Sequence, residues 1–461
     1  LSYMADTADH ATGSRAGLTG AIVRQADFDV YRHLMVPGGI WNDAMLEAWG
    51  ADTLRRDLGR SVDPALGLDC ALRVADCPAL FPRLTPVDED HDFALVRAAF
   101  AGRQRWTSET YADADFIDDE ARNGSALAEF SASARLADIR RQGTPVQYWG
   151  SWMDAGTADS ALARYRAAPN VPTQVIITAN SHGGDQNTDP FLSGEQPPAP
   201  AFESQVETMM DFAARVRAGE RIERSIHYYV LGAGEFRDTR VWPPRGVSMR
   251  RFHFAEGQAL NTRRPRTAGA DAYDVEFTAS TGGATRWSTQ LGTAAAYGDR
   301  RAADERLISY TSAPFDRDME LAGRPAVTIT LSAQTADPAI FVYLEDVAPD
   351  GRVTYLTEGQ LRAVSRRLAG RDELTYPIDG PAHTHERADA IPIVPGEAFE
   401  VRIGLFPVAA LIRQGHAIRV SIAGADADTF RRHSEGGPDR FTIMYGGANV
   451  SALSLPLRPW S

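Results

Sequence analysis

Short apolar runs alternate with helical patterns over the first half of the chain. Residues 18–23, 145–149 and 173–178 are apolar runs with the length of a buried parallel strand. Residues 158–167 separate the last two runs and are predicted to form a helix, which gives a β–α–β unit with parallel strands. A further helix is predicted from about 202 to 217. This part of the chain therefore has the pattern of an α/β sheet.

A different pattern lies between the first and second of these strands. Trp41, Met45, Leu46 and Trp49 fall at helical spacing and form an apolar stripe. Similar stripes recur near 93–100 and over 110–141. These repeats predict a largely helical insert of on the order of 110 residues, which is about the size of a small domain.

From about residue 224 to the end, the chain is a series of short strands separated by turns. Val327, Ile329 and Leu331 alternate with polar residues, which is the period of a half-buried strand. Pro349-Asp350-Gly351 separates two strand patterns and predicts a hairpin turn. Strands over more than 200 residues favour a β-sandwich, and we expect a jelly roll.

These patterns divide the 461 residues into three predicted domains. Residues 1–27 and 140–222 form the α/β core, residues 28–139 form a helical cap, and residues 223–461 form the sandwich. A chain of this length exceeds the usual size of one hydrophobic core, which agrees with several domains. The predicted class is thus α/β plus all-β.

Composition narrows the classes of partner. A net charge of −13 disfavours nucleic acid and anionic membrane surfaces, because both repel an acidic protein. No apolar run reaches the roughly 18 to 20 residues that span a bilayer. We expect a soluble protein, either cytoplasmic or periplasmic or secreted. Cys70 and Cys77 are too few for a disulfide scaffold, and we favour two buried thiols over a local bridge.

Candidate chemistry begins at the first residues. Leu1 to Ala8 have the pattern of the turn that carries the nucleophile of a serine hydrolase, with Ser2 at its tip. Asp154 follows the strand that ends near residue 149, and His182 follows the strand that ends at residue 178. Ligand and catalytic groups of parallel sheets collect at the carboxyl ends of strands. The order Ser, Asp, His is also that of the α/β-hydrolase triad.

Each candidate also has an ordinary interpretation. Ser2 alone is an unremarkable serine, Asp154 a turn residue and His182 a surface histidine. The three residue types in this order and at these element ends favour the triad. His383 and His385 have the spacing of a metal-binding pair, but no carboxylate or cysteine cluster accompanies them in the sequence, so we predict no metal site.

Several motifs resemble one known family. The run from Ser2 to Thr7, Pro37-Gly38-Gly39, Gly150-Ser151-Trp152-Met153-Asp154, and Ser181-His182-Gly183 are similar to those of the cocaine-esterase and α-amino-acid ester hydrolase family. That family shares its architecture with X-Pro dipeptidyl-peptidases. In the predicted sandwich, Ala348 to Gly351, Leu356 to Gly359 and Gly415 to Val420 also match. The resemblance spans nearly the whole chain and implies an α/β-hydrolase core, a helical cap and a C-terminal jelly roll.

The resemblance implies roles for individual residues. Ser2 is the nucleophile, His182 the general base and then acid, and Asp154 the carboxylate that orients His182. The backbone N–H of Tyr3 donates one oxyanion-hole bond. The chain departs from α-amino-acid ester hydrolases at Ala155 and Gly156, where those enzymes carry acidic residues.

Four aromatic residues are candidates for an apolar acyl pocket, although core packing is the preferred interpretation of each: Trp41, Trp49, Trp149 and Trp152.

The expected activity is hydrolysis of an ester or amide of a small acyl substrate, without a cofactor. An X-Pro-type dipeptidyl or aminoacyl peptidase, or an acyltransferase of the same fold, remains an alternative. A catalytically inactive protein that binds through its sandwich is a third. Since a hydrolase sheet has strands before its nucleophile, we also expect an N-terminal fragment or subunit of roughly 100 to 200 residues to complete the core. A homo-oligomer is a further expectation.

Overall fold

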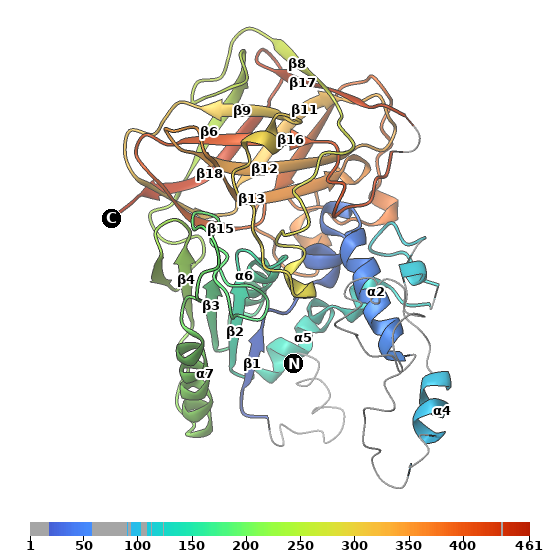
Figure 1. Ribbon diagram of the computed structural model, residues 1–461, viewed down its shortest axis with the longest axis vertical. Helices are drawn as coiled ribbons and strands as arrows, with labels where there is room; N and C mark the ends of the chain where they lie inside the picture. Colours follow the sequence, from blue (N-terminus) through green and yellow to red (C-terminus); the bar gives the residue numbers. More distant parts are fainter. Residues whose placement is uncertain are drawn as a thin grey trace.

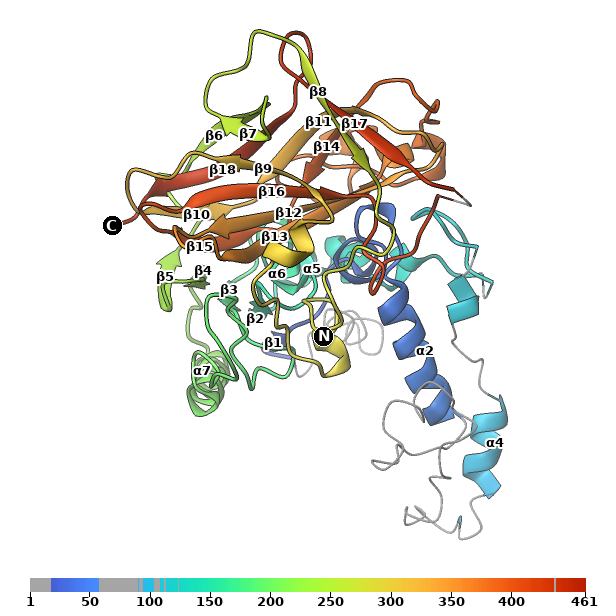
Figure 2. The ribbon, with the colours of Figure 1, turned by 45° about the horizontal axis from the view of Figure 1, so that its top comes forward.

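The computed structural model describes residues 18–57, 90, 94–102, 108–111, 113–122, 124–434 and 437–461. Within them, the chain forms a five-stranded sheet and a larger β-rich layer stacked on it (Figure 1). Helices α2 and α4 project to one side of the small sheet, away from α7 (Figure 2).

The small sheet has the strand order β1-β2-β3-β4-β5. The first four strands are parallel, and β5 pairs antiparallel with β4. The apolar runs of the sequence explain the buried strands, because both faces of β2 and β3 are covered. The strands are β1 (Ala21–Arg24), β2 (Val146–Ser151), β3 (Thr173–Thr178), β4 (Ser225–Val230) and β5 (Glu235–Thr239).

Two helices cover this sheet. Helix α6 (Thr157–Ala167) connects β2 to β3, as the β–α–β pattern predicts, and α7 (Phe202–Arg217) follows β3. Ile22 of β1 packs against the apolar residues of α7, whereas Ala21 and Val23 belong to the main core. Because neighbouring residues of a strand point to opposite faces, α7 covers the face opposite to the main core.

Short helices make up the described part of residues 28–142, and no strand occurs among the residues described there. In α2, Met45 and Leu46 are buried as their helical stripe predicts. Trp41 packs against Tyr111, with ring centroids 5.9 Å apart. The helices are η1 (Tyr31–Met35, a π-helical turn), η2 (Pro37–Gly39), α2 (Asp43–Asp57), α4 (Ala94–Gly102), η5 (Ser108–Tyr111), η6 (Leu127–Phe130), η7 (Ala132–Arg135) and α5 (Leu136–Gln142).

The C-terminal half forms a 13-stranded β-rich domain. The predicted hairpin at residues 349–351 joins β12 to β13, and Gly351 adopts a positive φ of 86° there. The strands are β6 (Ser248–Ala255), β7 (Ala259–Asn261), β8 (Gly269–Asp274), β9 (Ile308–Ser312), β10 (Met319–Gly323), β11 (Ala326–Ser332), β12 (Ala339–Val347), β13 (Val353–Arg362), β14 (Phe399–Gly404), β15 (Val408–Ile412), β16 (Ala417–Ala423), β17 (Arg440–Tyr445) and β18 (Ala452–Pro459).

Five short helices lie between these strands: η8 (Thr289–Leu291), α8 (Arg301–Asp304), η9 (Ala363–Ser365), η10 (Arg371–Glu373) and η11 (Arg387–Asp389).

The change from one sheet to the other lies further along the chain than residue 222, where the sequence pattern ends the core. Strands β4 and β5 still belong to the small sheet, so the change falls between Thr239 and Ser248. The other domain limits, and the jelly-roll assignment, stay predictions.

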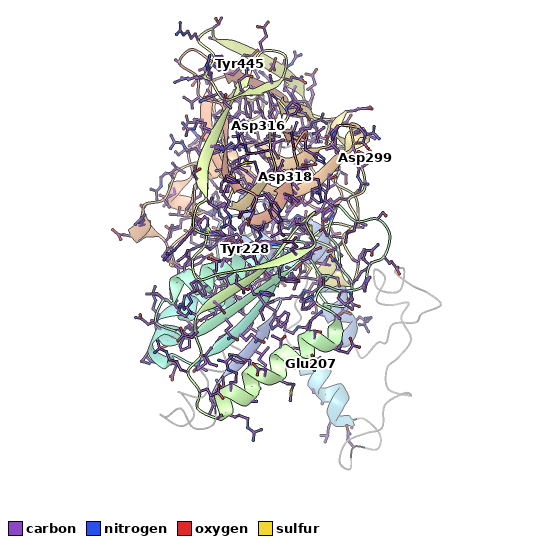
Figure 3. All side chains as sticks on the ribbon, turned by 90° about the vertical axis from the view of Figure 1, so that its left-hand side faces the viewer. Glu207, Tyr228, Asp299, Asp316, Asp318 and Tyr445 are labelled. Atoms are coloured by element: carbon purple, nitrogen blue, oxygen red, sulfur yellow. The ribbon has the colours of Figure 1, made fainter. Side chains whose placement is uncertain are left out.

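Buried charges connect the two layers. Glu320 of β10 is fully buried and accepts hydrogen bonds from Tyr228 of β4 (2.9 Å), Arg237 of β5 (2.6 Å) and Arg458 of β18 (2.8 Å). Tyr228 lies where the layers meet (Figure 3). A carboxylate shared by two guanidinium groups from different elements fixes the position of the β-rich domain on the sheet.

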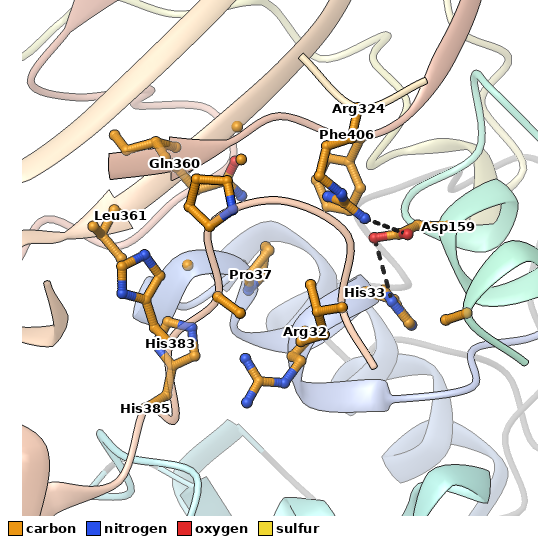
Figure 4. A pocket seen from close by; sticks show the side chains of 18 of the residues that line it. Arg32, His33, Pro37, Asp159, Arg324, Gln360, Leu361, His383, His385 and Phe406 are labelled. Carbon is orange, nitrogen blue, oxygen red and sulfur yellow. Dashed lines mark hydrogen bonds and ion pairs between the residues drawn. The ribbon is translucent and has the colours of Figure 1, made fainter. Parts of the chain in front are cut away.

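A second junction lies around a small pocket between α6, η1 and the β-rich domain (Figure 4). Arg324, in the turn between β10 and β11, forms an ion pair with Asp159 of α6, and His33 Nε2 lies 3.6 Å from the same carboxylate. Burial alone would raise the pKa of Asp159, but the charge of Arg324 and the His33 hydrogen bond hold that pKa well below its ordinary value.

Candidate active site

Asp154 and His182 lie at the carboxyl ends of neighbouring parallel strands. Asp154 comes three residues after the end of β2, and His182 comes four residues after the end of β3. The register pairs Ser151 with Thr178, so the two strands end at the same edge of the sheet. The strand lengths thus bring together two side chains that are 28 residues apart in the sequence.

The two side chains share a hydrogen bond. His182 Nδ1–H donates to Asp154 Oδ2 at 2.9 Å. Asp154 is completely buried, whereas the His182 ring is partly exposed. A bond at Nδ1 fixes the tautomer that leaves Nε2 as the proton acceptor. A histidine held in this way is suited to serve as a general base.

The surroundings of His182 change its basicity. Burial on its own would lower the pKa of His182, but the hydrogen bond and the charge of Asp154 raise it above the ordinary value. Asp27 raises this pKa further, and Arg24 opposes the increase. The pKa of His182 is raised overall, which makes His182 a stronger base than a free imidazole.

The segment 286–290 of the β-rich part holds the loop that carries Asp154. The Thr289 hydroxyl donates a short hydrogen bond to Asp154 Oδ1, so both carboxylate oxygens have partners. Ala155 has a positive φ of 40° and exchanges bonds with Arg286, its N–H donating to the Arg286 carbonyl at 2.8 Å and its carbonyl accepting from Arg286 Nε at 2.8 Å. These contacts stabilise a backbone conformation that a residue with a Cβ seldom adopts. Sequence reasoning missed Thr289, because nothing in its local pattern points to a residue 135 positions away.

The predicted site residues Ser2 and Tyr3 lie outside the described residues. The two cysteines, Cys70 and Cys77, also lie outside them. The interaction of Ser2 with His182 therefore stays a prediction.

The four candidate pocket tryptophans lie in different places. Trp49 of α2 lines a cavity and is partly exposed. Trp41 and Trp152 are buried and donate from Nε1 to the carbonyls of Ala114 (2.8 Å) and Tyr229 (2.7 Å).

Trp149 is also buried and donates from Nε1 to the Gln147 side chain at 2.9 Å. Trp41, Trp149 and Trp152 are not among the residues that line the cavity at Trp49.

The cavity at Trp49 has a volume of about 540 Å³. This size suits a small organic group. Apolar side chains make up most of its wall, and the lining residues are Asp27, Val30, Leu34, Met35, Met45, Trp49, Thr53, Tyr111, Leu127, Phe130 and Gln290.

Asp27 is an acidic residue in this otherwise apolar wall. Its Oδ1 atom is buried. Burial raises the pKa of Asp27 to about 7, the charge of His33 opposes the increase, and the charge of Asp154 adds to it. A side-chain hydrogen bond with Gln290 and the charge of His182 also lower this pKa, so Asp27 lies within electrostatic reach of the candidate catalytic pair. In the sequence, Asp27 looks like an ordinary loop residue after a short strand.

His383 and His385 carry no sign of metal binding in the described part of the chain. Both ring nitrogens of His383 lie 2.9 Å from backbone carbonyls, those of Arg367 and Arg402. Among the described residues, no group of three His, Cys, Asp or Glu side chains is arranged to hold a metal ion. The helices described here include none that is long and apolar enough to cross a membrane.

Comparisons with known proteins agree with this architecture. Residues 211–445, which are about half of the chain, match the family model of the X-Pro dipeptidyl-peptidase C-terminal non-catalytic domain. A candidate serine esterase of Mycobacterium bovis is 32% identical over 431 residues, which cover 87% of this chain and 66% of that protein. The cocaine esterase of a Rhodococcus species is 22% identical over 350 residues, which cover 70% of this chain and 55% of the esterase. The chain belongs to the family of the X-Pro dipeptidyl-peptidase C-terminal non-catalytic domain.

Solved structures share the fold of this chain. A CocE/NonD family hydrolase from Staphylococcus aureus superimposes with a TM-score of 0.62 at 16% identity, covering 95% of this chain and 67% of its own. An α-amino acid ester hydrolase gives a TM-score of 0.66 at 14% identity, covering 95% and 72%. These likenesses establish the α/β-hydrolase fold with a β-rich C-terminal domain.

The family match also shows which domain supplies the hydrogen-bond partner of Asp154. Thr289 lies inside the region that matches the non-catalytic domain, while Asp154 and His182 precede it. The PepX-type C-terminal domain therefore contacts the candidate catalytic carboxylate directly. The chain spans 66% of the length of the mycobacterial relatives that it matches.

Proposed function

We propose that this protein is a serine esterase of the CocE/NonD family that cleaves esters of small acyl groups through an acyl-enzyme on Ser2. The observation that carries the proposal is the His182–Asp154 hydrogen bond at the carboxyl ends of two adjacent strands. The 32% identity to a candidate serine esterase supports an ester over an amide or peptide substrate.

In the proposed mechanism, His182 Nε2 takes the proton from the Ser2 hydroxyl while Ser2 Oγ attacks the ester carbonyl. The N–H of Tyr3 stabilises the negative oxygen of the tetrahedral intermediate. The alkoxy group leaves with the proton from His182, which leaves the acyl group on Ser2. Water, deprotonated by His182, then releases the acid and restores the hydroxyl. Throughout, Asp154 keeps the ring oriented and stabilises its protonated form.

The apolar cavity at Trp49 is the proposed acyl pocket. Its polar residues Asp27 and Gln290 lie near the catalytic pair, because Gln290 directly follows Thr289, which binds Asp154. The jelly roll remains part of the proposal. The amide, peptide and acyl-transfer alternatives use the same triad.

A fluorophosphonate probe tests the proposal on the full-length protein. We expect the probe to label Ser2, as located by peptide mass spectrometry, and the label to disappear in Ser2→Ala. An intact, folded protein that takes no label would contradict a serine hydrolase and favour a binding protein.

The pH dependence of hydrolysis offers a second test. His182 acts as a base only when it is neutral, so kcat/KM falls as the pH drops through its pKa, which is raised above the ordinary histidine value. Asp27→Asn removes a negative charge that raises this pKa, so the midpoint of the acid limb is expected to move to lower pH. Asp185→Asn, which removes an exposed carboxylate three residues from His182, is the control and should leave the midpoint in place. An unchanged or higher midpoint in Asp27→Asn would contradict the electrostatic account.

A further inference from the structure

The small pocket between α6, η1 and the β-rich domain, which we call the junction pocket, has a wall rich in guanidinium groups. Arg32 of η1 and Arg324 of the β10–β11 turn line it (Figure 4), and so does Arg166 of α6. Its volume is about 90 Å³. One water molecule needs only roughly 10 to 15 Å³ of such space. The junction pocket therefore has room for a small polyatomic ion.

One of these three guanidinium groups has no ionic partner among the described residues. Arg324 pairs with Asp159, and Arg32 Nε lies 3.2 Å from Asp29 Oδ2. Arg166 forms no ion pair with a described carboxylate. Burial lowers the pKa of Arg166, and the charge of Asp159 opposes this decrease without cancelling it. The wall of the junction pocket thus carries a positive charge that is not paired within the described part of the chain.

The unpaired edge of Arg166 has a shape that oxyanions match. Its Nε and Nη2 atoms are buried and have no hydrogen-bond partner among the described residues. These two N–H groups lie on the same edge of the planar guanidinium and form a fork that binds two oxygen atoms of one carboxylate, phosphate or sulfate group. Asp159 and Asp379 act on Arg166 through their charges, but neither occupies the fork. A single-atom anion such as chloride would not match both N–H groups.

Three further nitrogen atoms without a described partner belong to residues of the β-rich domain that line the junction pocket. They are Arg324 Nε, Gln360 Nε2 and His385 Nδ1, and each atom is buried. The first two only donate hydrogen bonds. Burial and the charge of Arg32 lower the pKa of His385 well below its ordinary value, so its ring is neutral, and Nδ1 donates in one of the two neutral tautomers.

The number of donors indicates the shape of the ligand. A buried polar atom without a partner is costly, so the occupant of the junction pocket is expected to supply acceptors for these donors. A planar carboxylate has two oxygen atoms, and the fork of Arg166 engages both. A tetrahedral oxyanion has further oxygen atoms for the donors of the β-rich domain.

We propose that the junction pocket binds one small tetrahedral oxyanion of the phosphate or sulfate class. Arg166 binds two of its oxygen atoms through the Nε–Nη2 fork, and Arg324, Gln360 and His385 donate from the β-rich domain. The ion neutralises the charge of Arg166 and connects α6 to the β-rich domain. This site is independent of the proposed esterase activity.

Thermal unfolding of the full-length protein tests the site. The protein is first dialysed into Tris–chloride buffer, which contains no oxyanion. We expect low-millimolar sodium phosphate or sodium sulfate to raise the unfolding midpoint by about 2 °C or more and then to saturate, because a ligand that binds only the folded state stabilises it by mass action. Sodium chloride and sodium acetate at the same ionic strength should raise the midpoint less than half as much.

An ion that is already held tightly would prevent such a shift. Acid denaturation of the dialysed protein, followed by ion chromatography of the supernatant, detects that case. We then expect phosphate or sulfate in an amount equal to that of the protein.

Variants show whether the effect belongs to the junction pocket. Arg166→Gln removes the fork and should abolish both the midpoint shift and any released ion. Gln360→Leu, measured as well in case Arg166→Gln does not fold, should weaken the apparent affinity about tenfold, which is the size of a hydrogen bond to a charged group. The control is Arg221→Gln, because the Arg221 side chain is 88% exposed. That variant should respond like the wild type.

The outcomes are distinct. A saturable shift or a released ion that is lost in Arg166→Gln and weakened in Gln360→Leu supports the site. No shift and no released ion would mean that the junction pocket holds water only, which overturns the proposal. Equal stabilisation by chloride or acetate also overturns it, as does a wild-type response in both Arg166→Gln and Gln360→Leu.

Discussion

Replacing His182 by alanine is expected to lower kcat for ester hydrolysis by about 10⁴-fold or more, with KM changed only a few-fold. His182 is the base that Asp154 orients through a 2.9 Å bond, and no water-borne base can replace it in that position. Asp154→Asn should cost a similar factor, because an amide can donate to Nδ1 and stabilise the tautomer that has its proton on Nε2. The combination Ser2→Ala/His182→Ala should be no slower than either single variant, since the groups act as a unit. Steady-state kinetics with an aryl ester measure all of these effects.

The chain offers a matched control for this loss. His227 and Asp238 form a pair of the same kind and length, with Nδ1 2.9 Å from a carboxylate oxygen, but on exposed parts of β4 and β5. His227→Ala should leave kcat and KM unchanged. If His182→Ala kept more than about a tenth of the wild-type kcat, its assignment as general base would be wrong, because such a loss is far below that of a catalytic base.

Replacing Arg324 by methionine is expected to lower the free energy of unfolding by about 3–5 kcal/mol. Arg324 is the charge that holds the pKa of the buried Asp159 below its ordinary value. Methionine keeps the apolar length of the side chain and leaves the carboxylate buried without its main partner. Because Asp159 lies on α6 and Arg324 in the turn before β11, the loss weakens the contact between the two layers. Denaturant unfolding at pH 7 measures this change.

The stability that the Arg324–Asp159 ion pair contributes should depend on pH. A carboxyl whose pKa is lowered in the folded state stabilises the protein above its unfolded pKa, about 3.9, and this stability is lost as the pH falls below that value. The difference between wild type and Arg324→Met should therefore shrink below about pH 4. Asp159→Asn added to Arg324→Met should recover part of the loss, because no charge then remains unpaired.

Arg317→Met, which removes a pair between two exposed side chains, is the control and should leave the unfolding midpoint in place. A wild-type unfolding curve for Arg324→Met at pH 7 would contradict a structural role for the ion pair.

Much of the fold follows from local patterns. The predicted strand 173–178 and helix 202–217 coincide with β3 and α7. Both could be predicted because apolar runs and helical apolar stripes occur where side chains are buried. The hairpin at Gly351 follows from its turn residues. The sequence pattern places residues 223–239 with the β-rich domain, whereas β4 and β5 pair within the small sheet. A short amphipathic strand has the same pattern in either sheet, and only its pairing decides.

The candidate site could be predicted only in part. Asp154 and His182 follow buried strands, so their positions could be inferred from the sequence. Thr289 and Gln290 belong to the C-terminal domain. Thr289 contacts Asp154, which is 135 residues away, and no local sequence pattern predicts such a contact. Trp41 and Trp152 look equally suited to a pocket and to a core, and their Nε1 bonds to backbone carbonyls show that they pack in the core.

A crystal structure of the full-length protein after reaction with a phosphonate inhibitor tests the central claim most directly. The account predicts phosphorus bonded to Ser2 Oγ, with His182 Nε2 within hydrogen-bond distance of that oxygen and Asp154 still bonded to Nδ1. Phosphorus on another residue, or a Ser2 hydroxyl far from the His182 ring, would contradict it.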